Sequence, residues 1–319
     1  MPSAIRLLSP GNKAMESGYR YLCLPPAGDT VGVFRDVAGA ATAEIWGAEY
    51  PGRGDRWETP LPASLEQLAE QLTAEVLTRF VPGRVLRTVV AGFSMGAFLA
   101  VELAQRLHTH ACVAPAAIVV VGAPAPQKRV CGRYPQLGEA TLAEVLGSEG
   151  FVRGLGNRAS FEVWAYAKDL LRRDIELTTA YRGPADAARR CPLATLCGEA
   201  DPVETEDATV AWRTWTIGPF LAATVPESHL ELLAPGRGEQ FWAWMRRIEQ
   251  DVVAAGVRDA GPAAFRSGGR PRRARGGLAG AVRAAGTRVP GPHGPGCRRP
   301  RVALRRPATR EWPAGRRPV

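Results

Sequence analysis

The sequence is poor in several features that would assign it to a special class of protein. It has only six cysteines among 319 residues and no C-x-x-C pair, so neither disulfide bonds nor a zinc site is expected. It has no run of about 18 apolar residues that could span a bilayer. Nor does it begin with a basic segment followed by an apolar one, as a secretion signal does. We therefore expect a cytoplasmic protein with no membrane partner and no bound metal.

Lysine is absent from the last part of the chain, although positive charge is concentrated there. Residues 256–319 contain sixteen arginines against Asp259 and Glu311, a net charge of +14, which leaves −4 for residues 1–255 from the total of +10. This Arg/Gly/Pro/Ala-rich composition cannot bury a core, so we predict a disordered tail. Two alternatives are a gene read past or out of its frame and an arm that binds nucleic acid by charge. The tail has only two aromatic residues for base stacking, Phe265 and Trp312, so a nucleic-acid partner is not expected.

Short apolar or β-branched runs alternate with segments of helical periodicity along the chain. The predicted strands are 20–24, 43–50, 87–92, 117–122, 193–197 and 220–225. The predicted helices are 64–80, which opens with the capping box Ser64-Leu65-Glu66-Gln67, then 97–107 and 238 to about 253. This alternation predicts an α/β fold with a mostly parallel sheet covered by helices on both faces.

The same patterns divide the chain into three regions. Residues 1–18 show no periodicity and are predicted to be a loose leader, with Met15 an alternative start, before a folded domain at 19–255 and the tail at 256–319. Between residues 122 and 191 the alternation stops, and helical patterns at 141–146 and 161–181 have no convincing strand between them. An inserted helical lid at about 126–187 fits best, and one long crossover helix with extended loops is the alternative.

The most informative motif is Gly92-Phe93-Ser94-Met95-Gly96, which lies between an apolar run and a helical pattern. A serine hydroxyl is a weak nucleophile. A sharp strand-to-helix turn presents it to a base on one side and to backbone N–H groups on the other. Glycines at both ends would let the strand and helix backbones approach closely. The motif predicts a nucleophile elbow with Ser94 as the nucleophile, and an ordinary glycine-flanked turn is the alternative.

A serine nucleophile needs a base, and the chain has only four histidines. His108 and His110 lie beyond the far end of the predicted helix that follows the elbow, about 20 Å away at a rise of about 1.5 Å per residue. His293 belongs to the tail. His229 remains, and it directly follows the last predicted strand, where an α/β sheet presents its functional loops.

The predicted third member of the triad is Asp201, whose carboxylate would orient the imidazole. It follows the strand 193–197 through a short loop and completes the chain order Ser, Asp, His, while Glu199 and Asp207 are the alternatives. The oxyanion hole needs two preorganised N–H donors, which we assign to Met95 and to Ala27 in the loop after the first predicted strand. A simple Pro-Gly turn is the alternative for that loop.

Several separated motifs resemble those of type II thioesterases, the stand-alone editing hydrolases of polyketide and nonribosomal peptide synthesis. The matching segments are 22–28 (L-C-L-P-P-A-G), 50–56 (Y-P-G-R-G-D-R, for the signature P-G-R-G-x-R), 92–97 (G-F-S-M-G-A) and 191–202, together with Trp212, 218–220 and His229. The resemblance covers roughly residues 19–250. Pro26, Phe93 and Ser228 depart from the residues usual in the family, next to the catalytic positions and not at them.

The resemblance implies an α/β-hydrolase fold and a substrate acyl group held as a thioester on the phosphopantetheine arm of an acyl or peptidyl carrier protein. The partner would then be a carrier protein of antibiotic biosynthesis, the chain would act as a monomer, and no cofactor of its own would be needed. The lid would cover an acyl chamber. Its apolar residues would line that chamber or, as an equal alternative, pack the lid on the body of the domain: Trp164, Tyr166, Leu170, Leu171 and Ile175.

Other functions fit the same residues. A general carboxylesterase or a chain-releasing thioesterase would use the same triad, and strong activity on p-nitrophenyl esters would favour an esterase. A non-catalytic module that binds carrier proteins or nucleic acid could keep the hydrolase fold. Removal of the residues after Val257 would test the nucleic-acid alternative, because the basic residues are concentrated there.

Overall fold

The computed structural model describes residues 2–11, 18–128, 161–183, 191–199, 201, 206–226 and 231–256. All of them belong to one compact unit, Met1–Arg270. A second unit, Pro271–Val319, and the predicted tail from residue 257 onward lie outside the described residues.

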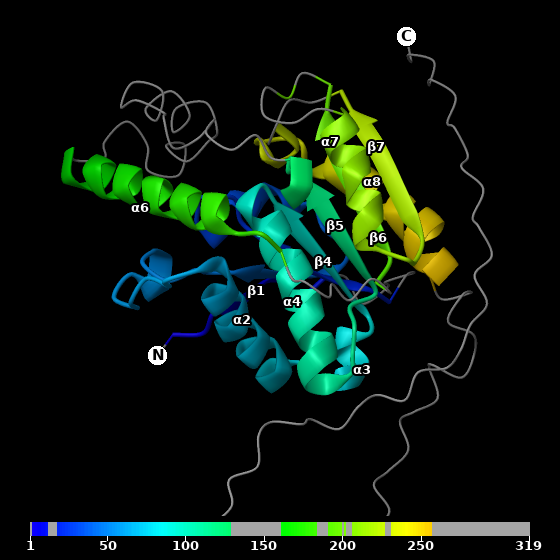
Figure 1. Ribbon diagram of the computed structural model, residues 1–319, viewed down its shortest axis with the longest axis horizontal. Helices are drawn as coiled ribbons and strands as arrows, with labels where there is room; N and C mark the ends of the chain where they lie inside the picture. The colour runs from blue at the N-terminus through cyan, green and yellow to red at the C-terminus, as the bar shows by residue number, and fades with distance from the viewer. Residues whose placement is uncertain are drawn as a thin grey trace, which may run out of the picture. The chain divides into compact units, whose positions relative to one another are not determined.

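A seven-stranded sheet forms the centre of the first unit (Figure 1). Its strands are β1 (Ile5–Ser9), β2 (Arg20–Leu24), β3 (Glu44–Ala48), β4 (Thr88–Phe93), β5 (Ala117–Val121), β6 (Leu193–Gly198) and β7 (Phe220–Val225). They lie in the order β1-β3-β2-β4-β5-β6-β7, and every neighbouring pair is parallel except β1 with β3. All six predicted strands are confirmed, with differences only at their ends.

Strand β1 is a correction to the sequence-based prediction, which treated residues 1–18 as a loose leader. Ile5 lies opposite Ala48 in the antiparallel pairing, and the Glu49 N–H donates to Ala4 O at 2.9 Å. Ile5 is fully buried, whereas Leu7 is half-exposed. An edge strand with so few buried residues has no apolar alternation for the sequence to show.

The helices cover both faces of the sheet, as predicted. They are α1 (Arg35–Gly39), α2 (Leu65–Arg79), α3 (Pro82–Val85), α4 (Met95–Ala111), α6 (Phe161–Ala180), α7 (Glu206–Val210) and α8 (Gly238–Ile248). Short 3₁₀ segments are η1 (Val31–Phe34), η2 (Gly54–Arg56), η3 (Pro126–Lys128), η5 (Ala211–Trp215) and η6 (Glu231–Leu233), and η7 (Glu249–Val253) is a π-helical end to α8. The predicted N-cap of α2 is present, because Ser64 Oγ accepts from the Gln67 N–H at 3.1 Å.

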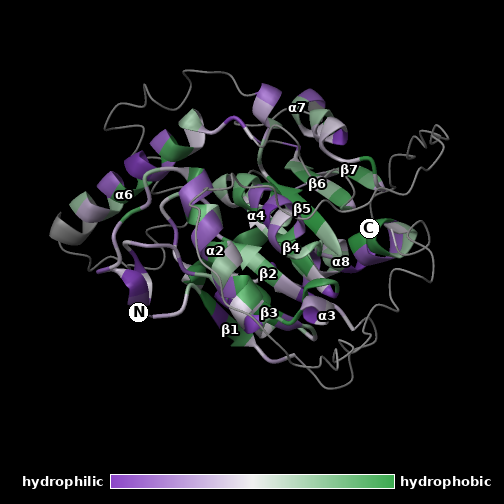
Figure 2. Cartoon of the chain, turned by 60° about the horizontal axis from the view of Figure 1, so that its bottom comes forward, coloured by the Kyte–Doolittle hydropathy of each residue, from purple (hydrophilic) through white to green (hydrophobic). Residues whose placement is uncertain are grey.

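Alternate residues of the strands enter two separate cores. In β4, Val90 packs with α2 and α4, whereas Val89, Ala91 and Phe93 pack with α1 and α8. Figure 2 shows the resulting apolar strands between the helical layers. A strand buried on both faces explains why the sequence shows continuous apolar runs there.

Four cysteines fall within the described residues, and none of the four is in a disulfide. Cys23, Cys191 and Cys197 are buried and Cys112 is exposed. Burial raises the pKa of Cys23 to about 12, so this thiol is unreactive at neutral pH. No helix in the described ranges has both the length and the apolarity needed to cross a membrane.

Candidate active site

Ser94 occupies a sharp turn between the end of β4 and the start of α4. Its φ of 49° and ψ of −113° form a backbone conformation that residues with a Cβ rarely adopt. The Ser94 N–H donates to Val121 O in β5 at 2.9 Å, and the Ala97 N–H donates to Ser94 O at 3.0 Å. The predicted strand-to-helix turn is therefore present, with Ser94 partly exposed at the carboxyl edge of the sheet.

Glycines are needed on both sides of this turn because backbones approach closely there. A Cβ on Gly92 would lie 2.1 Å from Gly96 O, and a Cβ on Gly96 would lie 2.2 Å from Leu24 O at the end of β2. These distances are far shorter than any van der Waals contact, so the sequence-based reason for the two glycines is confirmed. The close approach of Gly96 to Leu24 O also places the loop after β2 against the first turn of α4.

The two predicted oxyanion donors lie on these adjoining segments. Met95 is the first residue of α4, so its N–H is one of the unpaired donors of a helix N-terminus. Ala27 is partly buried in the loop after β2. Within the described ranges, neither N–H has a hydrogen-bond acceptor. Both amides can therefore receive a substrate oxygen, and their catalytic role stays a prediction.

The predicted acid and base belong to loops that follow neighbouring strands. Asp201 lies in a turn just beyond β6, in which its N–H donates to Gly198 O at 3.2 Å. The residue is partly buried. The alternatives Glu199 and Asp207 are both exposed. His229 lies outside the described residues, in the segment that follows β7.

Strand pairing brings the beginnings of these two loops together. Gly198 at the end of β6 pairs with Val225 at the end of β7, and β5 lies between β6 and the strand that leads to Ser94. The carboxyl ends of parallel strands meet at one edge, so the loops bearing Ser94, Asp201 and His229 all begin there. The contacts of the triad itself remain a prediction.

His108 and His110 lie in the last turn of α4, at the opposite end of that helix from Ser94. His110 Nε2 lies 3.4 Å from Glu70 Oε2 of α2. These two histidines were excluded as the catalytic base because of their distance along the predicted helix, and the structure places them away from Ser94, as expected.

Helix α6 is the described part of the predicted lid. The pattern at 141–146 and the remainder of the region between 129 and 160 lie outside the described residues. Leu170, Leu171 and Ile175 are buried, and Leu171 lies beside Gly28. For these three residues the structure favours packing of the helix on the body of the domain. Gly28 belongs to the loop after β2 (residues 25–29), which carries the predicted donor Ala27 and is called the oxyanion loop below. Tyr166 is half-exposed, and its hydroxyl donates to Gly52 O at 2.5 Å.

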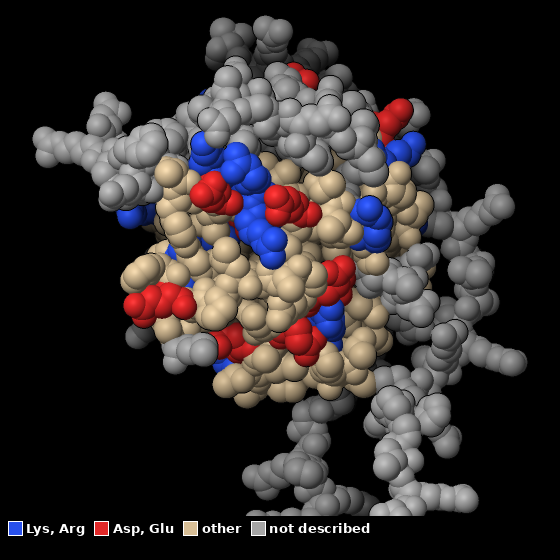
Figure 3. Space-filling model, turned by 60° about the vertical axis from the view of Figure 1, so that its left-hand side comes forward, with Lys and Arg blue, Asp and Glu red and all other residues tan. Residues whose placement is uncertain are grey.

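The outer face of α6 carries charges of both signs. Asp169 pairs with Arg172 at 3.0 Å and Glu176 with Arg173 at 3.5 Å, and these four side chains are between 42% and 69% exposed. In the view of Figure 3, basic and acidic side chains lie next to one another. Exposed pairs of this kind contribute little to stability.

A buried ion pair on the inner face of α6 was missed by sequence reasoning. Arg53, from the P-G-R-G-D-R segment after β3, makes two hydrogen bonds to Asp174 of α6, at 2.7 and 3.0 Å. Both side chains are about 3% exposed. Burial alone would lower the pKa of Arg53, but the charge and hydrogen bonds of Asp174 outweigh it and raise the pKa, so the guanidinium is charged. A signal for Asp174 existed, because this acidic residue falls among the buried apolar positions of α6.

Phe93, one of the departures from the family motifs, packs away from the Ser94 side of the turn. Its ring is fully buried and lies 5.3 Å from Phe34 and 6.0 Å from Phe241 of α8, measured between ring centroids. The residue before Ser94 therefore belongs to the core between the sheet and α8.

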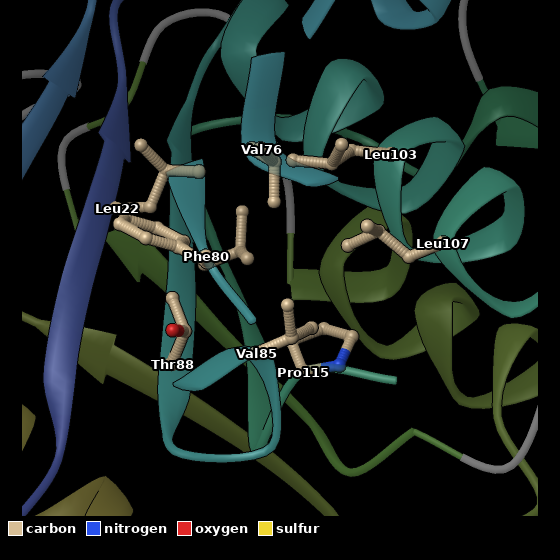
Figure 4. Close-up of a pocket in the computed structure, with 9 residues that line it drawn as sticks. Leu22, Val76, Phe80, Val85, Thr88, Leu103, Leu107 and Pro115 are labelled. Carbon is tan, nitrogen blue, oxygen red and sulfur yellow. The ribbon is translucent and has the colours of Figure 1, made fainter. Parts of the chain in front are cut away.

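A small apolar cavity lies far from this edge, between the sheet and helices α2 and α4 (Figure 4). Thr88, the first residue of β4, lines it together with Leu22, Val76 and Leu107. The cavity has no space for a molecule of the size of water. It is a packing defect in the core and takes no part in the candidate site.

Comparisons with known proteins agree with this architecture. Residues 20–250 match the thioesterase domain family. The probable cadicidin biosynthesis thioesterase of Streptomyces griseus is 31% identical over 72% of this chain and 63% of that protein. Thioesterase PikA5 of Streptomyces venezuelae is 30% identical over 69% of this chain and 77% of that protein. The match thus spans less than two thirds of the length of the cadicidin relative.

A solved structure that resembles this chain is that of the type II thioesterase BorB from the borrelidin biosynthetic cluster. It is 28% identical, with a TM-score of 0.62, and the match covers 79% of this chain and 99% of that one. The parallel sheet, its two helical layers and the strand-to-helix turn at Ser94 define an α/β-hydrolase. Within that class the chain belongs to the thioesterase domain family.

Proposed function

We propose that this protein is a stand-alone editing thioesterase, which removes aberrant or short acyl groups from the phosphopantetheine arm of acyl or peptidyl carrier proteins. The observation that carries the proposal is the Ser94 turn, with its strained backbone and two adjoining N–H donors, in a chain of the thioesterase domain family. The similarity to BorB, described as a type II thioesterase, supports the editing role. Carrier proteins of polyketide or nonribosomal peptide synthesis are the proposed partners.

In the proposed first step, His229 takes the proton of the Ser94 hydroxyl and the serine oxygen attacks the thioester carbonyl carbon. The Met95 and Ala27 amides donate to the oxygen that becomes negative. The carbon–sulfur bond then breaks, and the imidazolium returns its proton to the departing pantetheine sulfur. An acyl-serine remains.

In the second step the same histidine takes a proton from water, whose oxygen attacks the acyl-serine carbonyl. The carbon–oxygen bond to Ser94 breaks, Ser94 regains its proton and the free acid leaves. Asp201 keeps the imidazole oriented through both steps and stabilises its positive form. The reaction uses only side chains of this chain, backbone amides and water.

The decisive measurement is the mass of a carrier protein loaded with acetyl or propionyl groups, before and after incubation with the enzyme. We expect the acyl mass to disappear while the phosphopantetheine arm stays attached. The same acyl group on p-nitrophenol serves as the matched substrate without a carrier, and we expect a lower kcat/KM for it. A carrier that keeps its acyl group while the small ester is cleaved would contradict the editing role and favour a general carboxylesterase.

A further inference from the structure

The P-G-R-G-D-R segment, helix α6 and the oxyanion loop meet at one buried carboxylate. Asp174 Oδ2 accepts from the Gly28 N–H at 2.7 Å and from Arg53 Nη1 at 2.7 Å, while Oδ1 accepts from Arg53 Nη2 at 3.0 Å. Asp174 and Arg53 are both buried. Because the acceptor and the guanidinium are both ionised and shielded from water, these hydrogen bonds are stronger than ordinary backbone ones.

The guanidinium of Arg53 also binds the same loop directly. Its Nη1 donates to Asp29 O at 3.2 Å, while its Nε donates to Pro51 O of its own segment at 3.3 Å. The Tyr50 ring lies 5.3 Å below the guanidinium, and the Tyr50 hydroxyl donates to Pro25 O at 3.0 Å. The loop from residue 25 to 29 is therefore held along its length by the segment after β3.

These contacts fix the peptide planes on both sides of Ala27. The Asp29 N–H donates to Pro26 O at 3.3 Å, and Asp29 O is in turn held by Arg53. In a planar trans peptide the N–H points opposite to the C=O, so fixing Pro26 O fixes the direction of the Ala27 N–H. The next peptide is fixed by the hydrogen bond from the Gly28 N–H to Asp174.

We propose that Asp174 and Arg53 are positioning residues for the oxyanion hole, which hold the Ala27 amide toward the carbonyl of the thioester. This inference rests on the proposed function, because it assumes that the Ala27 amide receives the substrate oxygen. The geometry of the oxyanion hole then depends on α6, because Asp174, which holds the Gly28 N–H, is a residue of that helix. A misplacement of a donor by about 1 Å costs about 100-fold in rate, so the geometry of this pair controls turnover.

The test is Asp174→Asn, which keeps the shape of the side chain and removes its charge. We expect kcat to fall about 100-fold, on the acyl carrier protein and on the p-nitrophenyl ester alike, with KM close to the wild-type value. Asp169→Asn is the matched control, because Asp169 is an exposed carboxylate on the same helix that pairs only with Arg172 among the described residues. Its kcat and KM should equal those of the wild type.

A lost buried ion pair can also lower the amount of folded protein, so kcat is expressed per active site titrated with a fluorophosphonate. A trifluoromethyl ketone analogue, which adds to the catalytic serine and places a negative oxygen in the oxyanion hole, gives a second measurement. Its inhibition constant should rise by the factor by which kcat falls, while affinity for an uncleavable thioether analogue stays unchanged.

The possible outcomes separate this inference from the proposed function. An Asp174→Asn enzyme whose kcat per active site equals that of Asp169→Asn would overturn the positioning role while leaving the editing function in place. A trifluoromethyl ketone that binds this variant as tightly as the wild type would overturn it too. If the wild type cleaves only the small ester, the editing function fails, and the positioning role is still decided by kcat on that ester.

Discussion

Ser94→Ala is expected to lower kcat for thioester hydrolysis by at least about 10⁴-fold, because the acyl intermediate of the proposed mechanism forms on the Ser94 hydroxyl. Stability should change little, within about 0.5 kcal/mol, since serine and alanine both carry a Cβ and suffer the same strain at a φ of 49°. The measurements are release of the acyl group from a loaded carrier protein, followed by mass spectrometry, and thermal unfolding of both proteins.

Covalent labelling gives the control for this variant. A fluorophosphonate should add its mass once to the wild type and not to Ser94→Ala. Near-normal hydrolysis by the variant would remove the serine mechanism. Loss of hydrolysis with a large fall in melting temperature would instead leave the catalytic role of Ser94 unproven.

Gly96→Ala is expected to damage both stability and activity. The new Cβ would lie 2.2 Å from Leu24 O and 2.7 Å from Pro25 O. These are backbone atoms, which cannot rotate away from the Cβ as the end of a side chain could. Overpacking of this kind costs about 3 kcal/mol, which corresponds to a fall in melting temperature of about 10 °C for a domain of this size. The displaced loop carries Ala27, so we also expect a fall in kcat of at least about tenfold.

Gly83→Ala is the matched control for this prediction. Gly83 lies in α3, and a Cβ there would have no neighbour within 4 Å. Alanine should therefore stabilise the protein slightly, by about 0.5 kcal/mol, through its helix propensity. A Gly96→Ala enzyme with wild-type melting temperature and kcat would contradict the close approach of α4 to the loop after β2.

The sequence was most informative about features that leave a pattern in consecutive residues. The run Val89-Val90-Ala91 is apolar at every position because β4 is buried on both faces, and it identified a central strand. The elbow was predictable because its glycines leave a local pattern around Ser94. The choice of His229 followed from elimination among four histidines, a compositional accident that another chain would not offer.

The features that sequence reasoning missed depend on contacts between distant segments. Asp174 meets Arg53 across 121 positions of the chain, and neither residue's neighbours indicate the other. Strand β1 draws its stability from pairing with β3, and its own residues show little alternation. Such contacts are fixed by the fold as a whole, so they become visible only in three dimensions.

Strand β1 covers an edge of the sheet that β3 would otherwise leave open. A variant without residues 1–14 would lack all of β1. The backbone groups of β3 that now pair with Ile5 and Leu7 would form an open sheet edge. Open edges pair readily with other chains, so the shorter form should self-associate through β3 and precipitate during expression. Strand β1 thus protects the enzyme from association with other chains, a role separate from that of the candidate site.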